Sequence, residues 1–129
     1  MGKQIKRLVA LAAMVLGTVQ VFAAEPTLDG DWRLVGVQER PVDAGGTLTV
    51  ADGHISGSTG CNRFRAAYTL KGLSITVAPV AATKMYCKDR ALIERAFLAA
   101  LETVTVIEFS GDKLFMHYEP GDKMLEFAR

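Results

Sequence analysis

Several features that mark specialised protein classes are missing from this sequence of 129 residues. Lys and Arg (15) nearly balance Asp and Glu (14), so the basic excess that is typical of nucleic-acid-binding proteins is absent. There is no Gly-x-Ser-x-Gly nucleophile motif, no phosphate-binding loop ending in Gly-Lys-Ser or Gly-Lys-Thr, and no dinucleotide-binding fingerprint. Internal repeats and low-complexity segments are also lacking. We therefore predict no catalytic residue, no cofactor, no metal ion and no nucleic-acid partner.

Long hydrophobic runs are missing everywhere except at the N-terminus. Three basic residues precede an apolar run at residues 8–16, and Ala23 offers a small side chain at a cleavage position. This pattern predicts a secretory signal peptide over residues 1–23 and a single domain over residues 24–129. The apolar run falls short of the roughly 20 residues that a membrane span needs, and no cysteine lies at the cleavage point for lipid attachment. We expect export to the periplasm without a transmembrane anchor, with peripheral attachment to the outer membrane as an open alternative.

Alternating apolar and polar residues dominate the remaining chain and predict short, half-buried strands. Asp52-Gly53 favours a tight hairpin turn, and Lys71-Gly72 separates a second pair of strands, which Pro79 ends. The inward positions of that second hairpin are predicted to be Tyr68, Leu70, Leu73, Ile75 and Val77. The predicted strands cover residues 32–37, 47–51, 54–58, 66–70, 73–77, 104–109, 113–118 and 124–127.

One helix is predicted over residues 89–101, because this stretch is rich in Ala and Leu and contains neither Gly nor Pro. Asp89 can cap its N-terminus. An apolar stripe at helical spacing, which should pack on a sheet, comprises Leu92, Ala96, Phe97, Ala100 and Leu101. We predict an α+β fold, mostly β, in which about eight strands form a strongly curved antiparallel sheet or partial barrel with one helix.

The densest local pattern surrounds Asn62, the only asparagine of the sequence, which lies in a glycine-rich turn. Its neighbours and a second segment farther along the chain match the META domain family of HslJ-like proteins in order and type. The residues that carry this match are Gly57, Gly60, Cys61, Asn62, Phe64, Tyr68, Thr83, Met85 and Cys87. From about residue 28 to residue 127 the chain resembles this family. The resemblance implies a curved antiparallel sheet with a helix, and an envelope protein linked to heat shock and novobiocin resistance, without a defined molecular activity.

The two cysteines allow three interpretations. In an exported protein, Cys61 and Cys87 are expected to form a disulfide that ties the glycine-rich turn to the segment entering the helix. Alternatively, Cys61 and His54 belong to a small thiol- or metal-dependent enzyme, in which Cys61 acts as a nucleophile with His54 as its base. A third interpretation joins both cysteines with His54 and His117 as a zinc site, although the short paired spacings of such sites are missing.

Two candidate binding regions follow from the sequence, and neither has a motif of its own. Arg63 and Arg65, with Lys84, Lys88 and Arg90, could form a basic rim for anionic envelope components, or could simply be a solvated surface. By analogy with the implied fold, a cleft beneath the helix would be lined by Ile75, Leu92 and Phe97. We therefore expect a non-enzymatic, monomeric binding or interaction module, whose partner would be an envelope protein, a peptide or a small apolar ligand.

Overall fold

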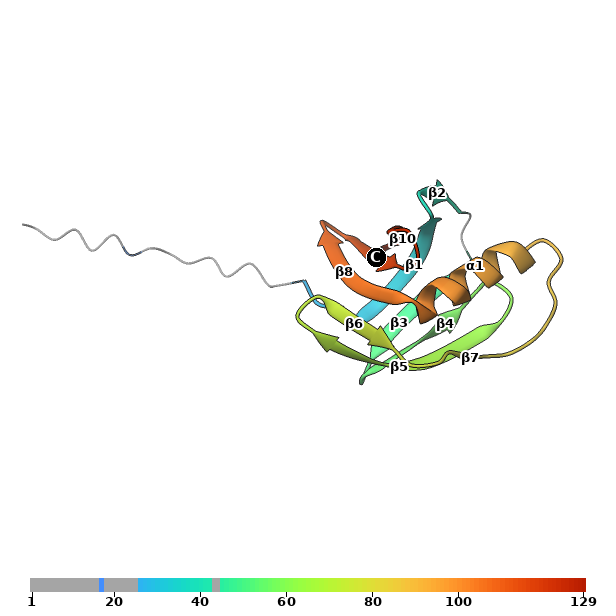
Figure 1. Ribbon diagram of the computed structural model, residues 1–129, viewed down its shortest axis with the longest axis horizontal. Helices are drawn as coiled ribbons and strands as arrows, with labels where there is room; N and C mark the ends of the chain where they lie inside the picture. Colours follow the sequence, from blue (N-terminus) through green and yellow to red (C-terminus); the bar gives the residue numbers. More distant parts are fainter. Residues whose placement is uncertain (1–16, 18–25, 43–44) are drawn as a thin grey trace, which may run out of the picture.

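The computed structural model describes residue 17 and residues 26–42 and 45–129. Apart from residue 17, the predicted signal peptide lies outside these described residues, so its prediction stays untested. Within the described part of the chain, no helix is both long and apolar enough to cross a membrane. The structure therefore bears on the domain that follows the predicted signal peptide (Figure 1).

The described residues form ten strands and one helix (Figure 1). The strands are β1 Gly30–Val37, β2 Arg40–Pro41, β3 Thr47–Ala51, β4 His54–Ser58, β5 Arg63–Lys71, β6 Ser74–Val77, β7 Ala81–Ala82, β8 Val104–Ser110, β9 Lys113–Tyr118 and β10 Lys123–Ala128, and the helix is α1 Ala91–Glu102. The predicted strands at residues 47–51, 54–58 and 113–118 are confirmed residue for residue. The two-residue strands β2 and β7 were not predicted, because two residues carry no readable alternation.

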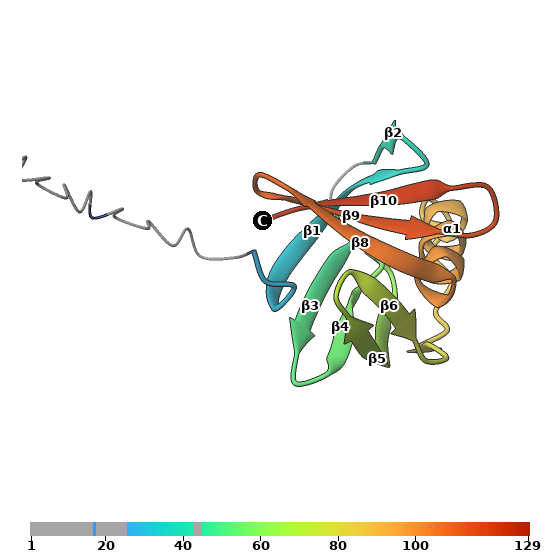
Figure 2. The same ribbon diagram turned by 60° about the vertical axis from the view of Figure 1, so that its left-hand side comes forward.

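The main strands form one antiparallel sheet that closes on itself. Eight of them follow the order β1, β3, β4, β5, β6, β8, β9 and β10, and pairing of β10 with β1 completes a barrel (Figure 2). The predicted mostly-β fold with one helix is confirmed, and the partial barrel is in fact closed. The weakest seam joins β6 to β8 through the single pair Ser74 and Val106, supported by a hydrogen bond from the Ile107 amide to the Leu73 carbonyl.

Local turn chemistry explains the hairpins. Asp52 and Gly53 both have positive φ, which suits a two-residue hairpin turn, and Ala51 pairs with His54 beside it. Gly72 likewise has positive φ at the β5–β6 turn. Leu70 and Leu73 beside that turn are exposed, so the prediction that they point inward was wrong. The hairpin extends past the barrel wall there, and only Ile75 of its predicted inward residues is fully buried.

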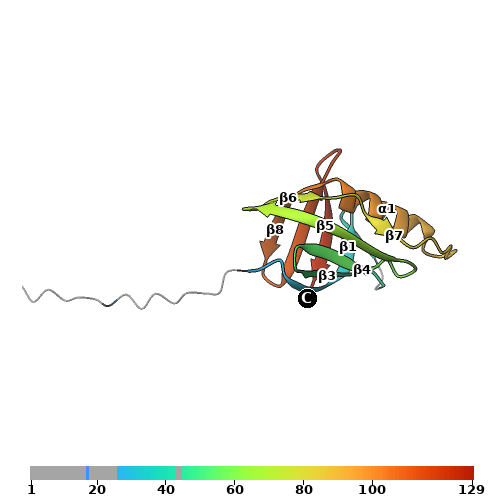
Figure 3. The same ribbon diagram turned by 90° about the horizontal axis from the view of Figure 1, so that it is seen from below.

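The core lies inside the barrel and under α1, which covers the end away from the described N-terminal segment (Figures 1 and 3). Phe97 of the helix is fully buried, packs edge-on against Phe64 with ring centroids 5.4 Å apart, and contacts Phe127 at 6.0 Å. Ala100 and Leu101 are buried beside it. The helical stripe is therefore confirmed at its C-terminal half.

The start of the helix differs from the prediction. Helix α1 begins at Ala91 with Arg90 as N-cap and no side-chain capping bond, so Asp89 is not the cap. The Arg90 amide donates to the Cys87 carbonyl, which makes the preceding turn part of the loop rather than of the helix. Leu92 in the first turn of α1 is 80% exposed, contrary to its predicted place on the buried stripe.

Candidate functional site

The turn between β4 and β5 is built around the buried hydroxyl of Thr59. Its Oγ1 accepts hydrogen bonds from the amides of Cys61 (3.2 Å) and Asn62 (2.8 Å), as in other short polar turns. Gly60 has a φ of 93°, which a residue with a side chain adopts only with strain. The turn thus places Cys61 and Asn62 side by side, facing the segment between β7 and α1.

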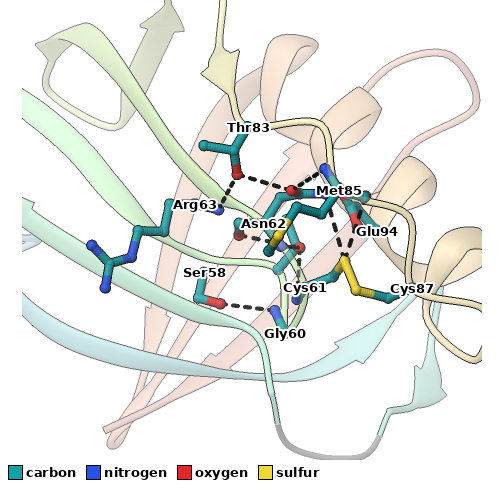
Figure 4. The surroundings of a disulfide bond; sticks show 10 residues. Ser58, Gly60, Cys61, Asn62, Arg63, Thr83, Met85, Cys87 and Glu94 are labelled. Atoms are coloured by element: carbon teal, nitrogen blue, oxygen red, sulfur yellow. Dashed lines mark hydrogen bonds between the residues drawn. A yellow bond between two sulfur atoms is a disulfide. The ribbon is translucent and has the colours of Figure 1, made fainter.

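Asn62 binds that segment through every polar atom of its side chain (Figure 4). Its Oδ1 accepts from the Thr83 hydroxyl at 2.8 Å and from the Met85 amide at 2.7 Å. Its Nδ2 donates to the Met85 carbonyl at 2.9 Å and to the Glu94 carboxylate of α1. Because the side chain is only 2% exposed, its amide acts as a buried clamp that fixes the loop and the helix to the barrel.

Cys61 and Cys87 form a disulfide next to this clamp, as predicted (Figure 4). Their Cα atoms are 6.0 Å apart, within the range that a disulfide spans. Both sulfur atoms are therefore oxidised and bonded, and neither is available as a thiolate for nucleophilic attack or zinc binding. The nucleophile and zinc interpretations of the cysteines are wrong for this state of the protein.

The two histidines lie in separate surroundings. His54 Nδ1 lies 3.1 Å from the Asp52 carbonyl at the β3–β4 turn, whereas His117 Nε2 lies 3.0 Å from the Glu108 carboxylate. His117 points away from the core residues of β9, as the alternation predicted. Among the residues that the structure describes, no group of three or more His, Cys, Asp or Glu could hold a metal ion.

The loop that Asn62 and the disulfide fix carries exposed apolar side chains. Met85 is 64% exposed and Tyr86 is 81% exposed, although the Met85 amide and carbonyl are both held by Asn62. Leu92, in the first turn of α1, is 80% exposed. We call residues 84–88 together with Leu92, Arg95 and Leu98 the loop–helix surface. It combines a fixed backbone with exposed side chains, whereas Leu98 at its edge is half-buried against the core.

Two shallow hollows flank this loop, with volumes of about 260 Å³ and 590 Å³. Both are lined by Met85, Tyr86, Glu94, Arg95 and Leu98, so these residues of the loop and α1 separate the two hollows. The sequence-based cleft beneath the helix is different, because Ile75 and Phe97 are packed in the core while Leu92 is outside. These three residues do not line a common cleft. The helix seals the barrel instead of covering an open hollow.

Positive charge gathers around the loop–helix surface. Residues 63–65 and 84–95 contain six Lys or Arg against two Asp or Glu, a net charge of +4. The rest of residues 24–129 contains six Lys or Arg against twelve Asp or Glu, a net charge of −6. Within residues 63–65 and 84–95, the exposed basic residues that form no ion pair with any described residue are Arg63, Arg65, Lys84, Lys88 and Arg95. The domain is therefore electrically polarised, with its positive end at this surface.

The remaining motif residues serve the barrel. A Cβ on Gly57 would lie 2.0 Å from the Thr47 carbonyl oxygen, so the close approach of β3 and β4 requires glycine there. Tyr68 is half-buried beside a hollow of about 490 Å³ near the β5–β6 hairpin, whose lining also includes Asp29 and Leu73. Burial raises the pKa of Tyr68, and the charge and hydrogen bonding of Asp29 raise it further. Sequence reasoning missed the roles of Thr59 and Glu94, since neither contact is local to a recognisable motif.

Comparison with solved structures supports the fold. An NMR structure of a protein from Burkholderia xenovorans superposes with a TM-score of 0.64 at 26% identity, covering 78% of this chain and 81% of that one. A crystal structure of a DUF4847 family protein from Bacteroides vulgatus gives 0.59 at 16% identity, covering 78% and 92%. A second NMR structure gives 0.60 at 19% identity, covering 76% and 86%. No curated protein matches the sequence.

The family assignment rests on the sequence. The family model described as META domain matches residues 25–129, which is most of the chain and includes both cysteines, the Asn62 clamp and the loop–helix surface. The resemblance inferred from the ordered motifs is therefore confirmed at the level of the family, and the chain belongs to the META domain family.

Proposed function

We propose that this protein is an exported, non-catalytic interaction module, and that the loop–helix surface is the part that contacts its partner. The observation that carries the proposal is the exposure of Met85 and Tyr86 on a loop that is held at both sides, by the disulfide and by the Asn62 clamp. Apolar side chains gathered on the surface of a soluble domain commonly mark a contact site.

A fixed loop is well suited to binding. Ordering a flexible loop during association costs free energy, so a loop whose backbone is already bound to the barrel loses less on binding. The clamp and the disulfide fix the backbone of Met85 and Cys87 while leaving the Met85 and Tyr86 side chains outward. These bonds support a role in which the loop presents the Met85 and Tyr86 side chains to a partner. A purely structural loop would not need to expose its largest apolar side chains.

Export is supported by the disulfide and by the basic and apolar start of the sequence. Disulfides form and persist in oxidising compartments such as the bacterial periplasm. The predicted signal peptide at residues 1–23 would direct the chain there. The links to heat shock, envelope stress and novobiocin resistance, and the finer HslJ-like assignment, stay predictions from the family resemblance. Catalysis by Cys61 with His54 has no support, because Cys61 is disulfide-bonded.

Site-specific photo-crosslinking tests the proposal. A photoreactive amino acid replaces Tyr86, and in a matched control it replaces Leu73, which is 54% exposed on the β5–β6 hairpin. We expect irradiation of cells that export the protein to give a discrete adduct, to protein or lipid, at position 86 and none at position 73. Equal labelling at both positions, or no adduct at position 86, would contradict the proposal.

A further inference from the structure

We infer that the loop–helix surface docks on a membrane surface rich in anionic phospholipids. This inference rests on the proposed function, because it names the partner of that same surface. Lys84, Met85, Tyr86 and Lys88 lie within five consecutive residues, so apolar side chains are bracketed by cations. Both chemical components of an interfacial contact are therefore present on one short, fixed loop.

The charge distribution favours an anionic surface over a neutral one. Residues 63–65 and 84–95 carry a net charge of +4, whereas the rest of residues 24–129 carries a net charge of −6, so the domain has a strong charge asymmetry. An anionic bilayer attracts the positive end and repels the negative remainder, which orients the molecule before contact. Lys84, Lys88 and Arg95 are exposed and form no ion pair with a described residue, so they can contact lipid phosphates.

The apolar side chains are of the kind that enters the headgroup region. Tyrosine is enriched at membrane–water interfaces, where its ring is partly buried and its hydroxyl stays hydrated. Met85, Tyr86 and Leu92 are each well over half exposed. Lysine, in contrast, is depleted from the cores of protein–protein interfaces, yet here two lysines flank the exposed pair Met85 and Tyr86. This combination fits a lipid surface better than a protein partner.

The position of the surface in the fold permits this contact. The loop and α1 lie at one end of the molecule, while the β5–β6 hairpin and the described N-terminal segment lie at the other (Figures 1 and 3). A bilayer can therefore meet the loop–helix surface without approaching the rest of the barrel. Since the disulfide and Asn62 fix the loop, docking requires no rearrangement of the backbone.

Vesicle flotation tests the inference with protein purified from the periplasm of cells that express the full chain. One set of vesicles contains phosphatidylethanolamine and phosphatidylglycerol, and a neutral set contains phosphatidylethanolamine and phosphatidylcholine. We expect flotation with the anionic set only, and release near 0.5 M NaCl, where the Debye length falls to about 4 Å. Replacing both Lys84→Gln and Lys88→Gln should weaken binding about 25-fold, at about fivefold for each cation.

The apolar contribution is tested separately. Met85→Ser with Tyr86→Ser should weaken binding to anionic vesicles about tenfold. The matched control combines Lys71→Gln with Leu73→Ser, which removes one cation and one exposed apolar side chain from the opposite end, and should leave binding unchanged. Each variant is first checked for an intact disulfide by mass and for an unchanged thermal transition, so that loss of binding is not loss of folding.

The outcomes separate this inference from the proposed function. Flotation that depends on phosphatidylglycerol and on the loop–helix residues supports the inference. Absence of flotation, equal binding to neutral vesicles, or equal effects of the control variant would overturn it. If vesicles fail while crosslinking at position 86 yields a protein adduct, the surface contacts a protein and only the membrane partner is wrong. If neither vesicle flotation nor crosslinking at position 86 gives a positive result, both the membrane inference and the proposed function are wrong.

Discussion

Substituting Asn62→Ala should destabilise the protein more than its small change in volume suggests. Besides a long contact from Nδ2 to Cys61 Sγ (3.6 Å), the substitution removes four hydrogen bonds, which involve Thr83, both backbone polar groups of Met85, and Glu94. A net contribution of about 0.5 to 1.5 kcal/mol per bond gives a range of about 2 to 6 kcal/mol. Met85 and Glu94 can regain some hydration, so we expect a loss of about 3 kcal/mol in the free energy of unfolding.

Urea unfolding under non-reducing conditions measures this loss. With a slope of about 1.5 kcal/mol per molar, the midpoint should fall by about 2 M. Thr105→Ala is the matched control, because Thr105 is exposed in β8 and should change stability by less than about 0.5 kcal/mol. An Asn62→Ala loss no larger than that of the control would refute the assignment of Asn62 as the clamp of the loop.

The substitution Asn62→Asp provides a second test of the same geometry. A carboxylate oxygen would replace Nδ2 and face the Met85 carbonyl and the Glu94 carboxylate, where it has no proton to donate. This repulsion raises the pKa of the new carboxyl group, so the destabilisation is present at neutral pH and is relieved as pH falls and the group becomes protonated. If Asn62→Asp is less stable than the wild type at pH 7 and this difference does not shrink as pH falls, the reasoning is contradicted.

Three further predictions follow from the barrel and the disulfide. Alkylation of the denatured, unreduced protein should add no mass, and two alkylated thiols before reduction would refute the bridge. Replacing both cysteines, Cys61→Ala with Cys87→Ala, should lower the free energy of unfolding by about 3.5 kcal/mol, the value for a closed loop with a sequence separation of 26. In Gly57→Ala the added Cβ would clash with the Thr47 backbone, so the free energy of unfolding should fall by about 3 kcal/mol or more. The control is Gly111→Ala, where the added Cβ meets no atom and only the positive φ is strained, so the loss should be about 1 kcal/mol. The pKa of Tyr68 is raised above 10.0 in the folded state, so its contribution to stability is full below that pH and is lost as pH rises through the folded pKa. In urea unfolding, the stability of Tyr68→Phe should therefore decline less steeply with pH over this range than that of the wild type. An identical decline in both proteins would count against the burial of the Tyr68 hydroxyl.

Elements determined by neighbouring residues were predictable from the sequence. The Asp52-Gly53 turn fixed the register of β3 and β4, and alternation placed His117 outward on β9. Contacts between distant segments were not predictable. Pairing of β1 with β10, which turns a curved sheet into a barrel, leaves no mark in either strand, because each shows the same alternation whether or not its edge is paired.

The site was predictable in its covalent part and not in its polar part. In an oxidising compartment, two cysteines of one domain have only each other as intramolecular partners, so predicted export led to the expectation of the Cys61–Cys87 bridge that the structure contains. Asn62 was singled out by its turn and by the family resemblance, but its bonds to Thr83, Met85 and Glu94 depend on how the loop returns across the barrel end. The prediction for Leu92 was wrong because helical spacing shows which residues share a face but not how far along the helix that face is covered, and only Phe97, Ala100 and Leu101 are buried.

Closure of the barrel by its first and last strands has a consequence for biosynthesis. Pairs such as Leu34 with Phe127 join the first and last strands of the barrel, so one edge of β1 has no partner until β10 has been made. A polypeptide that lacks the final strand exposes the unpaired edges of β1 and β9, which favours an unfolded or aggregating state over a stable intermediate. This topology therefore delays closure of the barrel until β10 has been made, however early the other hairpins form.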